Sequence, residues 1–192
     1  MWVFTTLGDV MKKAVLMSIK PKWCEKIFNG KKLIEIRKSR PELNEPFTVY
    51  VYCTKEKILG DLVLVKSYEF KAMFPNQRVV GVNKNAGTPL DLSLPGYVIG
   101  EFTCNKIEAL GEEDLFEGMD EISNSFYSEL SCVDIDDLLN YKGDSSHIYA
   151  WHISDILLYD TPKSLAEFNK YTDGLPVSRA PQSYMFVEEL DG

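Results

Sequence analysis

Short apolar runs and two-residue alternation dominate the hydrophobic pattern of this chain, and both are typical of β-strands. The strongest signal is 47–53, Phe-Thr-Val-Tyr-Val-Tyr-Cys, which is rich in β-branched and aromatic residues. The pattern predicts other strands at 14–19, 31–38, 97–104, 148–158 and 184–188, with a further candidate at 61–70. Because the helices are short and the connections suit hairpins, we predict an α+β, mainly β fold: a curved sheet or small β-barrel with short peripheral helices.

A helix is predicted at 21–29, between the first two strands. Pro21 suits its first turn, because the fixed φ of proline is helical and its missing N–H is not needed there. Trp23, Ile27 and Phe28 fall on one apolar face, which we expect to pack against the sheet. An Asn-Gly pair then ends the helix, since glycine accepts the left-handed conformation that follows many helices.

Two more helices are predicted in the second half of the chain. The clearer one is 135–141, with Asp134 as its candidate cap. Thr161 and Pro162 have the residue types of an N-cap and a first helical position, which predicts a helix running through Phe168.

The domain organisation predicted from these elements is one domain over 11–192. Gly, Pro and Asn crowd the segment 71–96, and 111–143 is acidic and only weakly helical, so both are interpreted as insertions. Residues 1–10 fit poorly with the strand that follows. We expect them to form a disordered extension, with Met11 as a more natural start.

Composition narrows the class of protein. The chain has 192 residues, of which 45% are hydrophobic, and no run of 18 apolar residues, so a packed core is expected and a membrane span is not. The four cysteines include no closely spaced pair and there are only two histidines, so neither a zinc site nor any other metal or cofactor is expected. Cysteines within apolar strands favour a reduced, cytoplasmic protein without disulfides.

Charge is distributed unevenly. The net charge is −8, from 21 basic and 29 acidic residues. Residues 11–40 nevertheless hold ten Lys or Arg against two acids, which leaves eleven basic and twenty-seven acidic residues elsewhere. A local excess of this kind is typical of an anion-binding surface, whereas the acidic remainder would repel a long duplex. The pattern favours a few nucleotides or one nucleoside as ligand.

The candidate site lies at 30–37, Gly-Lys-Lys-Leu-Ile-Glu-Ile-Arg, where the predicted helix gives way to a strand. Strand alternation places Glu35 and Arg37 on the side opposite to the isoleucines, and Lys32 stands at the start of the strand beside the helix end. Three charged groups can then converge on a small ligand. The alternative is a solvated surface pair worth less than about 1 kcal/mol.

The ordered pattern Ser-Ile-x-Pro, helix, Gly-x-Lys-x-x-Glu-x-Arg over residues 18–37 resembles the ASCH family, a branch of the PUA-like domains associated with RNA. The resemblance is looser in the later strands, and 179–184 is similar to small bacterial and phage-borne members. It implies a PUA-like β-barrel with a cleft beside the first helix. Roles in the family include RNA binding, deacetylation of N(4)-acetylcytidine by an amidohydrolase branch, and a proposed nuclease. The resemblance aligns Lys32 with the motif lysine of the amidohydrolase, but Glu35 stands where that enzyme has threonine.

The candidate residues have distinct expected roles. If the protein is an enzyme, a desolvated Lys32 acts as base or nucleophile and Glu35 orients it or relays a proton. Arg37 binds a phosphate or a carbonyl edge. Trp151 is a candidate for stacking on a base, although tryptophan within a strand more often belongs to the core. The full ligand-binding set is Ser18, Lys20, Lys22, Lys32, Glu35, Arg37 and Trp151.

Three functional interpretations follow. The first is an RNA- or nucleotide-binding domain that recognises a short single-stranded RNA or a modified nucleoside. The second is a hydrolase that acts on a modified nucleoside or on RNA through the same cleft. The third is a protein-interaction module, which the acidic bulk and the insertions favour.

Overall fold

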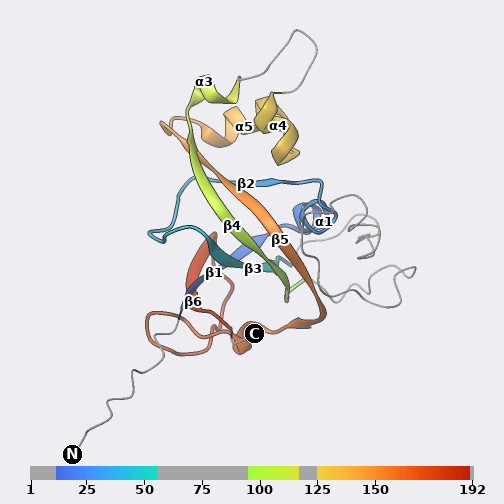
Figure 1. Cartoon of the computed structure of the whole chain (residues 1–192), viewed down its shortest axis with the longest axis vertical. Helices are drawn as coiled ribbons and strands as arrows, with labels where there is room; N and C mark the ends of the chain where they lie inside the picture. The colour runs from blue at the N-terminus through green and yellow to red at the C-terminus, as the bar shows by residue number, and fades with distance from the viewer. Residues whose placement is uncertain (1–11, 56–94, 117–124, 191–192) are drawn as a thin grey trace, which may run out of the picture.

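The structure is a computed structural model that describes residues 12–55, 95–116 and 125–190 (Figure 1). Its centre is one six-stranded sheet with the strand order β2-β5-β4-β3-β1-β6. The outer strands β2 and β6 do not pair with each other in the described part of the chain, so the sheet is curved and open rather than closed into a barrel. The strands are β1 (Lys13–Ile19), β2 (Ile34–Arg37), β3 (Phe47–Cys53), β4 (Val98–Leu110), β5 (Ile148–Lys163) and β6 (Tyr184–Glu188).

The mainly β, α+β prediction is confirmed, and each predicted strand within the described residues is present. The strand at 31–38 is shorter than predicted, and those at 97–104 and 148–158 extend further, to Leu110 and Lys163. The candidate strand 61–70, the extension 1–10 and nearly all of 71–96 lie outside the described residues. No helix in the described ranges is long and apolar enough to cross a membrane.

The helix predicted from Thr161 to Phe168 is wrong. Strand β5 continues through Pro162, and only a short 3-10 turn, Leu165–Glu167, follows it. The register between β4 and β5 is irregular here. Leu158 and Lys163 are five residues apart on β5, but their partners on β4, Gly100 and Val98, are only two residues apart. Proline is tolerated in such a bulge, since no ladder hydrogen bond from its nitrogen is required.

The strand pairs are mostly antiparallel, as the predicted preference for hairpins over parallel crossovers implies, but one pair is parallel. Strands β1 and β3 are neighbours and run parallel, with α1 (Pro21–Phe28) and β2 in the connection between them. Parallel strands end at the same edge of a sheet. The end of β1 and the residue after β3 therefore lie together, and they bring Ser18 and Thr54 close to the start of α1.

Both faces of the sheet are covered. Helix α1 packs through Cys24, Ile27 and Phe28 on a core cluster formed by β1, β3, β4 and β5. Trp23 was predicted to share that buried face, but it is only half-buried and sits at the border of the cluster. Its ring lines the pocket described below and has lysine ammonium groups near it.

The described parts of the acidic segment, 111–116 and 125–143, form short helices that cover one end of the sheet: α3 (Glu112–Leu115), α4 (Phe126–Ser131) and α5 (Ile135–Lys142) (Figure 1). Ile34 and Ile36 of β2 share a core cluster with Tyr127 of α4 and Leu138 of α5. The isoleucine face of β2 is thus buried under this segment, which places α5 beside the candidate site.

Candidate functional site

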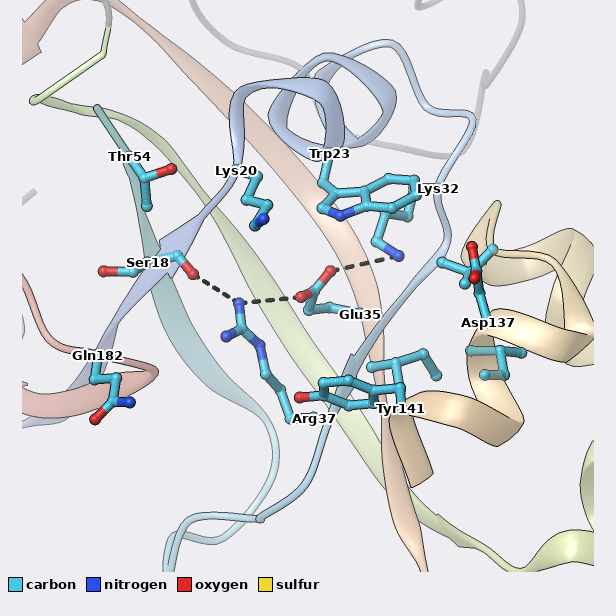
Figure 2. Close-up of a pocket in the computed structure, with 13 residues that line it drawn as sticks. Ser18, Lys20, Trp23, Lys32, Glu35, Arg37, Thr54, Asp137, Tyr141 and Gln182 are labelled. Atoms are coloured by element: carbon cyan, nitrogen blue, oxygen red, sulfur yellow. Dashed lines mark hydrogen bonds and ion pairs between the residues drawn. The ribbon is translucent and has the colours of Figure 1, made fainter. Parts of the chain in front are cut away.

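A pocket of about 500 Å³ lies between α1, β2, α5 and the ends of β1 and β3 (Figure 2). This volume is within the range of about 300–1,000 Å³ that is usual for small-ligand sites. Three segments far apart in the sequence supply its walls. The lining residues are Ser18, Lys20, Trp23, Lys32, Glu35, Ile36, Arg37, Thr54, Val133, Asp137, Leu138, Tyr141 and Gln182.

Lys32 is held in place by the backbone of the helical segment. Its Nζ donates a hydrogen bond of 2.6 Å to the carbonyl oxygen of Ser131 and lies 3.4 Å from Glu35 Oε2. The side chain is 2% exposed. Burial lowers the pKa of Lys32 below its ordinary value of 10.5, and the neighbouring Glu35 carboxylate opposes that shift without cancelling it.

Glu35 connects two cations. Its Oε1 lies 3.0 Å from Arg37 Nη2, while its Oε2 faces Lys32. Arg37 Nη2 also donates to the Ser18 carbonyl oxygen at 2.8 Å, and Nη1 donates to the Ser183 hydroxyl at 3.4 Å. Figure 2 shows the resulting chain of contacts from Ser18 through Arg37 and Glu35 to Lys32. The alternative of a solvated surface pair is therefore excluded for these residues, because the network is buried.

Several polar atoms in the pocket have no hydrogen-bond partner among the described residues. They are Glu35 Oε2, Arg37 Nε and Thr54 Oγ1. Buried polar groups are normally paired, so each such atom calls for an explanation. All three belong to residues that line the pocket, although the atoms themselves are buried, and Glu35 Oε2 already forms the ion pair with Lys32.

The two sides of the pocket differ in charge. Figure 2 shows Lys20, Arg37 and Thr54 on the side of β1 and β3, whereas Asp137 lies opposite on α5. Trp23 and Tyr141 lie on opposite sides of Glu35 in that view. The pocket thus combines a cationic side, an acidic side and two aromatic rings.

Most of the predicted ligand-binding residues meet at this pocket, namely Ser18, Lys20, Lys32, Glu35 and Arg37. Lys22 does not line it; this side chain is exposed, with Nζ 4.3 Å from the centre of the Trp23 ring. The assignment of Trp151 to ligand stacking is wrong. Trp151 is completely buried and packs edge-on against Phe47 and Tyr184, at 5.8 and 5.3 Å between ring centres.

Sequence reasoning missed the contribution of the helical segment. Asp137 and Tyr141 are four residues apart on a predicted helix, so they share one face, but nothing in the sequence showed which face meets β2. The carbonyl group of Ser131 carries no residue-specific signal at all. Thr54 follows strand β3 and Gln182 precedes strand β6. Both reach the pocket because these strands flank β1, with β3 parallel and β6 antiparallel to it. No three His, Cys, Asp or Glu side chains gather as a metal site in the described ranges.

Comparison with known proteins bears on the fold. No protein-family model and no curated protein matches the sequence. Among solved structures, the ASCH protein from Zymomonas mobilis aligns over 92% of this chain and 88% of its own, with a TM-score of 0.57 and 16% identity. A single-residue variant of that protein aligns over 93% and 92%, respectively, with the same TM-score and 15% identity. The chain has the ASCH-domain fold.

The similarity to the Zymomonas mobilis structures covers nearly the whole chain, so it includes the sheet and helix α1. At 15–16% identity it concerns the fold alone. An argument about function therefore depends on the side chains of the pocket.

Proposed function

We propose that the pocket binds one nucleotide, either free or as a unit of a short single-stranded RNA. The observation that carries this proposal is the buried Lys32–Glu35–Arg37 network, which opens onto a pocket shared with Lys20 and Trp23. A buried set of two cations and one anion keeps a positive excess and suits an anionic ligand.

The phosphate belongs on the side of β1 and β3. Lys20 supplies a cation there, and the Arg37 guanidinium and the Thr54 side chain line the same part of the pocket. Arg37 is held by Glu35 and the Ser18 carbonyl, so its position is set before a ligand arrives. A donor held in this way loses little entropy on binding.

The base belongs against Trp23. Its ring is half-buried and lines the pocket, and cations lie near it, with Lys32 Nζ 4.9 Å from the ring centre. Stacking of a base on an aromatic side chain contributes about 1–3 kcal/mol and tolerates any base. Tyr141 offers a second aromatic surface across the pocket.

The test is a calorimetric titration of the protein with a nucleoside monophosphate and with a short RNA at several salt concentrations. Binding should weaken as salt rises, with a log–log slope of about −0.7 for each phosphate neutralised on a single strand. Lys20→Ala should weaken binding and reduce this slope. Lys31→Ala is the matched control, because Lys31 is exposed and does not line the pocket. Flat salt dependence, or no binding at low salt, would refute the proposal.

A second candidate function is hydrolysis of a modified nucleoside at the same pocket. It is favoured by Lys32, whose pKa is lowered by burial and whose Nζ lies close to a carboxylate. A lysine that loses its proton readily can act as a general base toward water, and Glu35 can accept or return that proton. In the amidohydrolase that the sequence resembles, threonine stands at the position of Glu35, so this chain would use a different partner for its lysine.

Acetate release from N(4)-acetylcytidine, measured beside cleavage of a mixed RNA pool, separates the two candidates. In a hydrolase, Glu35→Gln protein that is saturated with substrate and shown by unfolding curves to be folded should turn over about 100-fold or more slowly. Wild-type protein that binds nucleotides but forms neither product at high enzyme concentration would exclude the hydrolase and leave the binding function.

A further inference from the structure

We infer that the turn at the end of α4, which the hydroxyl group of Ser128 holds in place, positions Lys32 in the pocket. Ser128 is then a positioning residue, because it does not line the pocket itself and acts through residues 131–133. The inference rests on the proposed nucleotide-binding function and extends it to the part of the chain that prepares the site for its ligand.

The end of α4 and the residues before β2 contact each other one by one. The contacts join 31–33 to 130–132 in antiparallel order: Cys132 Sγ donates to the Lys31 carbonyl oxygen at 3.2 Å, Lys32 Nζ to the Ser131 carbonyl oxygen at 2.6 Å, and Leu33 N to the Leu130 carbonyl oxygen at 2.8 Å. The middle contact is buried and holds the ammonium group of Lys32. The direction of the Ser131 carbonyl group therefore decides where Lys32 Nζ lies.

The backbone of this turn has an unfavourable conformation. Cys132 has a φ of 56° and a ψ of 31°, which is the left-handed region. Glycine adopts this conformation freely at the end of a helix, whereas a residue with a side chain does so at a cost. Such a residue persists only where its surroundings hold it. Contacts outside Cys132 are therefore needed to keep the turn in place.

Ser128 supplies those contacts. Its Oγ donates a hydrogen bond of 2.6 Å to the Val133 carbonyl oxygen, and its own carbonyl oxygen accepts from Val133 N at 3.3 Å. Ser131 Oγ also donates to the Ser128 carbonyl oxygen, at 3.3 Å. Ser128 is 3% exposed and Ser131 is completely buried, so water does not replace a hydroxyl group that is removed here. Without the Ser128 hydroxyl group, Val133 loses its shortest tie to the helix.

Loosening the turn should change the charge of Lys32. Burial lowers the pKa of Lys32, and the Glu35 carboxylate opposes this shift. A hydrogen bond to the Ser131 carbonyl oxygen also favours the ammonium form. If that oxygen turns away while the side chain stays buried, the pKa of Lys32 falls further. A neutral Lys32 leaves the pocket with one positive charge less, and an anionic ligand then binds more weakly.

Other charged and titratable groups share the surroundings of Lys32, and they come from each element that packs around it. They are Glu35 and Arg37 on β2, Cys132 after α4, Asp137 and Tyr141 on α5, and Lys20 before α1. A valid comparison keeps these groups the same. Substitution of Ser128 does so, and two variants of Cys132 that both lack the thiol differ only in how easily their backbone adopts the left-handed conformation.

A buried serine in a short helix has an ordinary explanation, which is that its hydroxyl group satisfies backbone groups at the helix ends. Ser125 provides the control for it. This residue is completely buried at the opposite end of α4, where its Oγ accepts from Ser128 N at 3.2 Å. Ser125→Ala and Ser128→Ala should both lower stability, whereas only Ser128→Ala should alter Lys32.

The first measurement is a pH titration of the Lys32 Cε resonance by NMR in the full chain, assigned with Lys32→Met, with unfolding curves to confirm that each variant folds. We expect Ser128→Ala to lower the pKa of Lys32 and Ser125→Ala to leave it unchanged. The pKa should also be lower in Cys132→Val than in Cys132→Gly, because a β-branched residue resists the left-handed conformation that glycine adopts. This second pair decides the inference if Ser128→Ala does not fold.

The second measurement is calorimetric titration with adenosine monophosphate at pH 7 and at about pH 9. Ser128→Ala should bind about tenfold more weakly than wild type at the higher pH, and the difference should shrink at pH 7, where Lys32 regains its proton. An unchanged or raised pKa of Lys32 in Ser128→Ala, the same change in Ser125→Ala, or equal values in the two Cys132 variants would overturn the inference while the proposed function stands. If wild type does not bind the nucleotide, the proposed function fails, and the NMR titration still decides whether the turn positions Lys32.

Discussion

Removing the charge of Glu35 is the most informative perturbation of this protein. In Glu35→Gln the shape of the side chain is kept, but Lys32 and Arg37 lose the anion that lies 3.4 and 3.0 Å from them. Their side chains are only 2% and 11% exposed, so water cannot replace the carboxylate. Breaking a buried ion pair from one side costs about 3–5 kcal/mol.

A second route limits the part of that loss that comes from Lys32. Lys32 can lose its proton and become neutral. The ordinary pKa of 10.5 lies roughly 3.5 units above pH 7, and each unit corresponds to about 1.4 kcal/mol, so deprotonation at pH 7 costs about 5 kcal/mol. The two figures agree. We therefore expect Glu35→Gln to lower the free energy of unfolding by about 3–5 kcal/mol at pH 7.

The pH dependence of this stability loss shows whether the unpaired charge of Lys32 causes it. Without Glu35 the pKa of Lys32 in the folded protein falls further below 10.5, so between these values the unfolded chain binds a proton that the folded chain does not. Stability then rises with pH across that window. The defect of Glu35→Gln should consequently shrink between pH 7 and about pH 10, as the pH approaches the ordinary pKa of Lys32, 10.5, above which Lys32 is neutral in both states.

Urea unfolding followed by circular dichroism at both pH values measures these differences. Glu25→Gln on α1 is the matched control, since Glu25 is only half-buried and lies outside the pocket. Adding Lys32→Met to Glu35→Gln should restore at least about 1 kcal/mol, because it removes one stranded cation. A loss below about 1 kcal/mol that is the same at both pH values would show that the network is solvated and refute the reasoning.

Three further predictions concern packing and charge. Gly100→Ala should cost about 3 kcal/mol in unfolding free energy, since its Cβ would collide with a backbone oxygen of β5 and lie 2.7 Å from the Phe28 ring; a neutral effect would contradict the packing of α1. Trp23→Ala should lower the free energy of unfolding by only about 1–2 kcal/mol, because the ring is half-buried, and unfolding curves measure this loss. The same change should weaken nucleotide binding about tenfold, as measured by calorimetric titration. The hydrogen bond with Lys106 is the main cause that lowers the pKa of Glu108 below 4.5. The ionised carboxylate therefore stabilises the folded protein above pH 4.5, and this contribution is lost as the pH falls below that value. Glu108→Gln should make the melting temperature less dependent on pH between pH 3 and about pH 5.

The alternation of β2 and the end of the preceding helix were enough to predict where Lys32, Glu35 and Arg37 lie. The alternation of β2 placed Glu35 and Arg37 on one side and the two isoleucines on the other, and the helix stop placed Lys32 beside them. The same rules could not place Trp151, because both faces of a central strand are buried and an aromatic residue is equally suited to a core or a binding surface.

The missing parts depend on long-range packing. The carbonyl group that holds Lys32 comes from Ser131, 99 residues later, and a backbone oxygen is the same in every residue. The pairing of β1 with β3 is parallel, so the connection through α1 and β2 had to be known before Ser18 and Thr54 could be brought together. Such contacts follow from topology, which neighbouring residues do not encode.

The basic residues of 11–40, which the sequence suggested as an anion-binding surface, are not gathered on one surface in the folded protein. Two of them, Lys32 and Arg37, are buried and share Glu35, and Lys22 lies over the Trp23 ring, so the excess does not form one continuous basic surface. On the other side of the pocket, the first turn of α5 carries Asp136 and Asp137, of which Asp137 lines the pocket. A long polyanion crossing the pocket would meet those carboxylates and be repelled. The arrangement instead suits a ligand whose negative charge is confined to one end, which is the charge distribution of a single nucleotide.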